Sequence, residues 1–235
     1  MQGTFLGLGA DDWKAVWLSV EISLAALALS LPWGVGLGWL LARKSFPGKS
    51  LVETVLNLPL VLPPVVTGLL LLYLLGRRGW IGAWLHAWFG LEIALTWKAA
   101  VVAVAVMGFP LLVRAVRIAV EGIDPRLHQA ARSLGAGPWR AFWSVSLPLA
   151  ASGIVAGSVL AFARGLGEFG ATLMFAGIRP ETKTLAIQVY VLNNQPGDEY
   201  EQRMWRVVMA SVVVAFAALS LGEYLQRRAR AHESS

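Results

Sequence analysis

Three long stretches without a charged side chain constrain the fold of this chain more than any other feature. They are residues 22–42, 54–76 and 141–163. At a rise of about 1.5 Å per residue, each is long enough as a helix to cross a hydrocarbon core of roughly 30 Å. Only 14% of the residues are charged and 57% are hydrophobic, whereas about a quarter of a soluble domain is charged. The sequence therefore predicts an all-α integral membrane protein.

Two apolar runs, residues 99–113 and 207–222, are shorter. The first reaches spanning length if residues 93–98 are counted, and the second if Trp205, Arg206 and Tyr224 are counted, because Lys98 and Arg206 can extend toward the headgroups. We therefore expect one membrane domain over residues 1–235 with five transmembrane helices. The predicted spans are residues 16–42, 51–75, 93–113, 147–167 and 205–225.

Residues 169–191 are open to two interpretations. A sixth span is possible by length, but Arg179, Glu181 and Lys183 interrupt the segment. Because charged side chains are costly inside a bilayer, the sequence favours a short re-entrant or outer-surface segment.

The distribution of Lys and Arg predicts the orientation. Residues 43–49, 114–140 and 227–230 carry eleven of the 20 Lys and Arg residues, and in a five-span chain they face the same side. The acidic side chains Asp11, Asp12, Asp198, Glu199 and Glu201 fall on the other side. The positive-inside rule then predicts the N-terminus outside and the C-terminus in the cytoplasm. We expect the chain in the cell membrane, which is the inner membrane where there are two.

The chain shows no pattern of a catalytic or metal site. It has no cysteine, and His86, His128 and His232 lack the spacing of metal ligands. The net charge is +6, and the basic residues stand in loops beside apolar spans. Membrane topology explains this arrangement better than nucleic-acid binding does. Gly48-Lys49-Ser50 resembles the end of a phosphate-binding loop, but Arg43 stands where the first glycine is needed. We expect no catalytic residue, no metal and no nucleotide site in this chain.

Two features predict a translocation path. Pro59, Pro63 and Pro64 interrupt the second span, and a lipid-exposed helix does not readily tolerate the lost backbone hydrogen bonds. We interpret this helix as kinked and lining a pore, and a kink needed only for packing is the alternative. Arg164 and Glu168 lie one helical turn apart at the end of the fourth span. They are candidates for a gate, and a simple salt bridge at a helix end is the alternative.

A polar segment between the third and fourth spans has the pattern of a helical loop. Asp124 is a good N-cap, Pro125 suits the first helical position, and Gly135 provides a stop. Gln129-Ala130-Ala131 stands three residues before Gly135, and nine residues then lead to Val145-Ser146-Leu147-Pro148.

That spacing resembles the cytoplasmic loop shared by the inner-membrane subunits of ABC importers, in which Glu stands at the position of Gln129 and Ile at that of Val145. The resemblance implies a helical coupling loop over residues 121–143 that docks an ABC ATPase subunit. It assigns the coupling contacts to Gln129, Ala130, Ala131, Gly135, Leu147 and Pro148.

Further runs are similar to the permeases of molybdate importers. They include residues 58–64, 76–82, 109–115 and 160–172, and the similarity extends from about residue 13 to 226. The resemblance implies a homodimer that carries molybdate or tungstate. It also implies an extracytoplasmic oxyanion-binding protein and ATP with Mg²⁺ bound only by the partner ATPase.

Other classes stay open. Residues 167–171 also resemble sulfate and thiosulfate permeases, so these are the first alternative. An ATP-independent secondary transporter and a membrane-embedded enzyme are more distant alternatives. The docking motif argues against an ATP-independent transporter. The lack of a cluster of reactive side chains argues against an enzyme.

Overall fold

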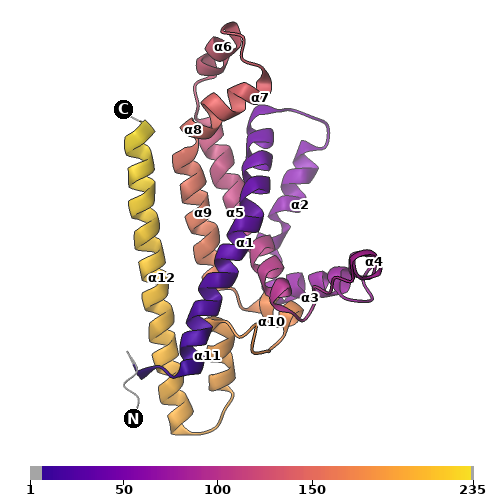
Figure 1. Ribbon diagram of the computed structural model, residues 1–235, viewed down its shortest axis with the longest axis vertical. Coiled ribbons are helices and arrows are strands. Elements are labelled where there is room, and N and C mark those ends of the chain that lie inside the picture. The colour runs from indigo at the N-terminus through magenta and orange to yellow at the C-terminus, as the bar shows by residue number, and fades with distance from the viewer. Residues whose placement is uncertain (1–6, 234–235) are drawn as a thin grey trace.

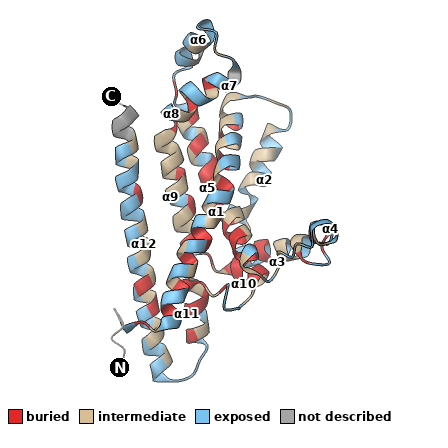
Figure 2. Ribbon diagram, viewed as in Figure 1, coloured by how far each residue is buried: buried red, intermediate tan, exposed pale blue. Residues whose placement is uncertain are grey.

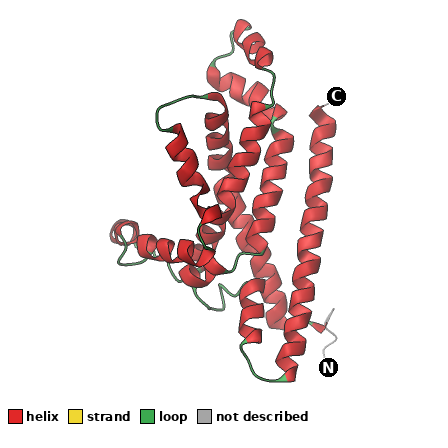
Figure 3. Ribbon diagram, turned by 180° about the vertical axis from the view of Figure 1, so that it is seen from behind, coloured by secondary structure: helices red, strands yellow, loops and turns green. Residues whose placement is uncertain are grey.

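The computed structural model describes residues 7–233, except for the side chains of His128, Pro138 and residues 230–233. All regular structure in this range is helical, as predicted (Figure 3). The longest helices are Ala10–Arg43 (α1), Trp97–Glu121 (α5), Ala151–Leu166 (α9) and Asp198–Glu233 (α12), which form an elongated bundle (Figure 1). The shorter helices are Lys49–Val61 (α2), Pro64–Leu75 (α3), Trp80–Phe89 (α4), Pro125–Ser133 (α6), Pro138–Ala141 (α7), the π-helix Phe142–Ser146 (η2), Leu147–Leu149 (α8), Gly170–Ala176 (α10) and Leu185–Asn193 (α11).

The two ends of the bundle differ in character. The end that carries α6 and α7 is called the loop end here, and the C-terminal part of α12 reaches toward it (Figure 1). The opposite end, where α1 begins beside α11, is called the N-terminal end. The start of α1 and the end of α12 therefore lie toward opposite ends of the long axis (Figure 1).

Three helices are long and apolar enough to cross a membrane by themselves: α1, α5 and residues 198–229 of α12. Two bent pairs also qualify if each is taken as one span. They are α2 with α3, bent by 117°, and Trp139–Leu149 with α9, bent by 68°. By length and composition, the described chain thus has three to five spans.

The prediction of a single kinked helix over residues 51–75 is wrong. Leu62 and Pro63 lie outside helical structure, and α3 runs in a different direction from α2. Pro63 and Pro64 lack an N–H group, so two successive helical hydrogen bonds are lost and the chain breaks. The fourth predicted span is also not one helix from residue 147, because it bends at Ala150, two residues after Pro148.

Small residues bring the central helices close together. A Cβ atom on Gly34 of α1 would lie 2.6 Å from Leu112 Cδ2 of α5, and one on Gly38 would lie 2.8 Å from Val116 Cγ1. Glycine is therefore required along this α1–α5 contact. Figure 2 shows the buried residues concentrated in α1, α5 and α10, whereas α12 is largely exposed.

The segment at residues 169–191 contains two short helices, α10 and α11, of seven and nine residues. Neither is long enough to cross a bilayer alone. The helices here are short, as expected, and the re-entrant or outer-surface placement of this segment stays a prediction.

Candidate coupling loop and translocation path

The predicted helix start at Asp124 is present in the structure. The Asp124 carboxylate accepts a hydrogen bond from the backbone N–H of Arg126 at 2.9 Å, and Pro125 occupies the first position of α6. Gln129, Ala130 and Ala131 lie in this helix, which projects beyond the ends of α1 and α2 (Figure 1).

Gly135 ends this unit in a left-handed conformation with φ of +82°. Its N–H donates to the Arg132 carbonyl at 2.9 Å, and the next N–H, of Ala136, donates to the Ala131 carbonyl at 3.0 Å. Gly135 is exposed, and a Cβ atom there would meet nothing within 4 Å. The backbone angle alone therefore explains why glycine suits the position.

The loop exposes large apolar side chains. Leu134 is 88% exposed and Trp139 is 73% exposed. Leu127 and Trp143 are exposed as well. Apolar side chains gathered on a projecting polar segment are typical of a surface that another protein covers.

The loop returns to the bundle through a π-helix. Leu147 and Pro148 follow it in the short helix α8, so the two halves of the predicted motif lie at the start and at the return of the same loop. Side chains from the last turns of α1 contact both ends of this loop. Arg43 Nη2 donates to the Ile123 carbonyl at 3.3 Å, and Trp39 Nε1 donates to Ser146 Oγ at 3.2 Å.

The proline-rich segment forms an exposed break in the backbone. Pro59 lies inside α2, Pro63 at the break and Pro64 at the first position of α3. Val61, next to the break, is 81% exposed. Because Pro63 and Pro64 carry no N–H, the carbonyls of Pro59 and Leu60 lose their usual helical donors.

The segment after α9 packs directly against this break. A Cβ atom on Gly170 would lie 2.9 Å from Pro64 Cβ. Two residues earlier in the chain, Glu168 Oε1 accepts the backbone N–H of Ala171 at 2.9 Å. The structure therefore brings the candidate path residues Pro64 and Glu168 into neighbouring positions.

Arg164 and Glu168 form the ion pair that their spacing predicts. Arg164 Nη1 lies 2.7 Å from Glu168 Oε2. The Glu168 side chain is 1% exposed and that of Arg164 is 30% exposed. One partner is thus fixed inside the fold, and the other reaches the surface.

Sequence reasoning missed a buried polar cluster at the N-terminal end. Asp12 is fully buried and accepts from Arg203 Nε at 2.9 Å, from Gln188 Nε2 at 2.7 Å and from the backbone N–H of Gly9 at 2.9 Å. The cluster joins α1, α11 and α12. The only signal in the sequence was that an acidic residue and a basic residue each stand near the outer end of a span.

Within residues 7–233, no group of three His, Asp or Glu side chains could hold a metal ion. The chain also contains no cysteine. The described part of the chain thus offers an exposed loop surface and a broken helix pair.

Comparisons with known proteins agree with this geometry. The family described as "Binding-protein-dependent transport system inner membrane component" matches residues 34–231. The molybdenum transport system permease protein ModB of Escherichia coli is 51% identical over 220 residues, which cover 93% of this chain and 95% of the relative. The sulfate transport system permease protein CysW of Synechocystis is 35% identical over 226 residues, which cover 94% of this chain and 79% of the relative.

A solved structure of the MetNI methionine ABC transporter in an inward-facing conformation has the same fold. Its TM-score is 0.72 at 20% identity, with 92% of this chain and 95% of that chain covered. Because the family match covers most of the chain and the Escherichia coli relative nearly all of it, this chain belongs to the inner membrane components of binding-protein-dependent transport systems, which are transport subunits and not enzymes.

Proposed function

We propose that this chain is the membrane-spanning subunit of an ATP-driven importer whose substrate is molybdate, with tungstate as a close chemical alternative. The similarity to the molybdenum permease of Escherichia coli supports this substrate, since it exceeds the similarity to the sulfate permease of Synechocystis. Sulfate or thiosulfate is the second candidate.

The observation that carries the proposal is the projecting loop of α6 and α7 with exposed Leu134 and Trp139. A chain without a nucleotide site needs an external source of energy, and these side chains offer a surface for an ABC ATPase. Gln129, Ala130, Ala131 and Gly135 lie at its start, and Leu147 and Pro148 at its return. The side-chain hydrogen bonds from Arg43 and Trp39 would pass a movement of the loop to α1.

The proposed topology is one membrane domain with five spans, the N-terminus outside and the C-terminus in the cytoplasm. Termini at opposite ends of the bundle require an odd number of crossings (Figure 1). Three or five spans would both satisfy this condition, and we propose five, with each of the two bent pairs counted as one span. The loop end carries the basic segments, so the positive-inside rule places it in the cytoplasm.

We assign the translocation path to the break between α2 and α3, with Pro59, Pro63 and Pro64, and to the neighbouring residues Arg164 and Glu168. Irregular backbone at membrane depth occurs where it meets protein or water and not lipid. The exposed Val61 beside the break therefore indicates that a second copy of the chain or an aqueous path covers this face. A homodimer with the path between its subunits would provide both a second copy of the chain and an aqueous path at this face. An extracytoplasmic binding protein would deliver the oxyanion to that path.

Uptake by the reconstituted complex tests the substrate. The chain is purified with its ABC ATPase, placed in liposomes and supplied with the oxyanion-binding protein, ATP and labelled molybdate. We expect uptake that depends on ATP. Tungstate should suppress this uptake, and a hundredfold excess of sulfate should not. Suppression by sulfate at equal concentration would assign the chain to the sulfate group, and uptake without ATP would reject the importer.

A further inference from the structure

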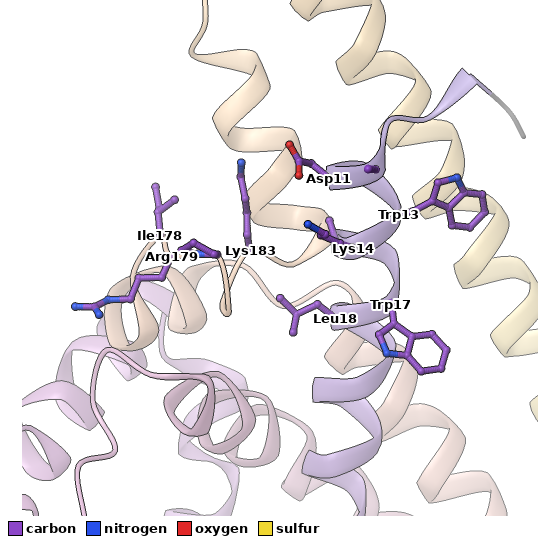
Figure 4. A pocket seen from close by; sticks show the side chains of 11 residues that line it. Asp11, Trp13, Lys14, Trp17, Leu18, Ile178, Arg179 and Lys183 are labelled. Carbon is purple, nitrogen blue, oxygen red and sulfur yellow. The ribbon is translucent and has the colours of Figure 1, made fainter. Parts of the chain in front are cut away.

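A cavity of about 790 Å³ at the N-terminal end is not explained by the proposed import path. It lies between the first turns of α1 and the turn at residues 177–184. In Figure 4, Asp11, Lys14 and Leu18 point from α1 toward Lys183 and Ile178, while Trp13 and Trp17 point to the other side of α1. Arg179 stands at the edge of the cavity, with its guanidinium directed outward.

The cavity holds two cations that have no partner in the described part of the chain. Across residues 7–233, the side-chain amino groups of Lys14 and Lys183 form no ion pair and no hydrogen bond. Leu18, Ile178 and Pro180 supply apolar walls beside them. The carboxylate of Asp11 also lines the cavity, so the side chains of Lys14, Lys183 and Asp11 together leave one net positive charge beside the apolar walls. A net positive charge next to apolar walls favours a ligand that has both an anionic and an apolar part.

Both walls of the cavity are fixed by buried hydrogen bonds. In the turn, Thr182 Oγ1 donates to the Gly177 carbonyl at 2.7 Å and accepts the Arg179 N–H at 3.0 Å. The buried Ser19 hydroxyl of α1 accepts the N–H of Leu185 at 2.7 Å, which joins the turn to α1. These contacts fix the backbone of both walls, so a ligand has to order mainly the side chains of Lys14 and Lys183.

The surrounding residues place the cavity at the level of lipid headgroups. Leu18 lies four residues before the charge-free stretch of α1 begins at Ile22, a rise of about 6 Å along the helix. Trp17 is 70% exposed, and Trp205 of α12 is 57% exposed. Trp205 lies two residues from Arg203, which pairs with Asp12 of α1. Exposed tryptophans at one level on two neighbouring helices are typical of a membrane interface.

We propose that this cavity binds an anionic phospholipid, with the phosphate between Lys14 and Lys183 and the start of an acyl chain along Leu18 and Ile178. A lipid headgroup and a free phosphate share the anionic chemistry. The apolar walls and the neighbouring tryptophans favour the lipid, and they also favour it over an acidic surface of another protein.

Titration of the purified full-length chain in nonionic detergent with phosphatidylglycerol, followed by native mass spectrometry, tests the site. The pocket variant is Lys14→Gln with Lys183→Gln. The control variant is Arg78→Gln with Lys98→Gln, which removes the same charge from exposed residues outside the cavity. We expect roughly 25-fold weaker binding in the pocket variant, about fivefold for each lysine, and binding within about twofold of the parent in the control. Phosphatidylcholine should bind the parent weakly.

Three results would overturn the proposal. One is equal loss of phosphatidylglycerol binding in the pocket and control variants, which would mean that only net charge matters. Another is competition by glycerol 1-phosphate at the same concentration as the lipid, which would identify a free-anion site. The third is unchanged lipid binding with lost capture of the oxyanion-binding protein, which would identify a protein-docking surface.

Discussion

Gly68 of α3 and Ala171 of α10 cross so closely that a Cβ atom on Gly68 would lie 2.6 Å from the Ala171 carbonyl oxygen. The contact is between two backbones, so no flexible side chain can move to make room. It continues at Pro64 and Gly170, close to the break that follows α2. The two segments assigned to the path therefore behave as one packed unit.

The first prediction is that Gly68→Ala destabilises the protein by about 1–3 kcal/mol, because a methyl group in this crossing must displace backbone. Gly36→Ala in α1 is the matched control, since a Cβ atom there meets nothing within 4 Å. Thermal unfolding of the purified chain measures both. Equal midpoints for the two variants would show that α3 and α10 separate without cost.

The second prediction concerns the buried ion pair of Asp12 and Arg203, whose side chains are 0% and 32% exposed. Arg203→Leu leaves a carboxylate buried without its cation, which costs about 3 kcal/mol or more. Asp12→Asn removes the buried charge and leaves an arginine that reaches solvent, so it should cost less. Asp11→Asn is the control because Asp11 is exposed and should stay near the parent.

Thermal unfolding of the three variants decides this prediction. The expected order of stability is Asp11→Asn, then Asp12→Asn, then Arg203→Leu. A reversed order of the last two would mean that the buried carboxylate is stabilised mainly by Gln188 and Gly9.

Local chemistry made some of these features predictable. Asp124, Pro125 and Gly135 each act on the backbone within a few residues, so the start and end of the α6 unit follow from these three residue types. The break at Pro63 was predicted only as a kink, because its angle depends on how α3 packs across α10. The pairing of Asp12 with Arg203 joins residues 191 positions apart, and no local rule selects one outer arginine over another.

The third prediction separates backbone strain from surface change in the coupling loop. A Cβ atom on Gly135 or on Gly137 would meet nothing within 4 Å, but only Gly135 has positive φ, at +82°. Gly135→Ala should therefore strain the loop by about 1–2 kcal/mol and lower co-purification of the ABC ATPase several-fold. Gly137→Ala should not. Equal recovery of ATPase with both variants would remove Gly135 from the docking unit.

The fourth prediction tests the proposed orientation. The chain has no native cysteine, so single cysteines report their own positions. Ser133→Cys in α6 should resist a membrane-impermeant maleimide in intact cells and react after the cells are opened, whereas Arg78→Cys should react in both. Both residues are exposed. Reaction of Ser133→Cys in intact cells would reverse the topology.

The last prediction concerns Arg164 and Glu168 as a gate. A dianion crossing a region of low dielectric is stabilised by a nearby cation, but an unpaired arginine would hold it too strongly. Glu168→Gln keeps an oxygen that can accept the Ala171 N–H, while it removes the charge next to Arg164. We expect it to slow molybdate uptake several-fold with little loss of stability, and Arg164→Ala to lower uptake while the protein stays folded.

A purely structural ion pair predicts a different pattern. Both single variants would then lose stability, and the double variant would recover part of it, because residues in contact show non-additive effects. Uptake and thermal unfolding measured on the parent, the two single variants and the double variant separate the two roles. Unchanged uptake in both single variants would exclude Arg164 and Glu168 from the gate, because a charge that controls an oxyanion cannot be removed without altering its passage.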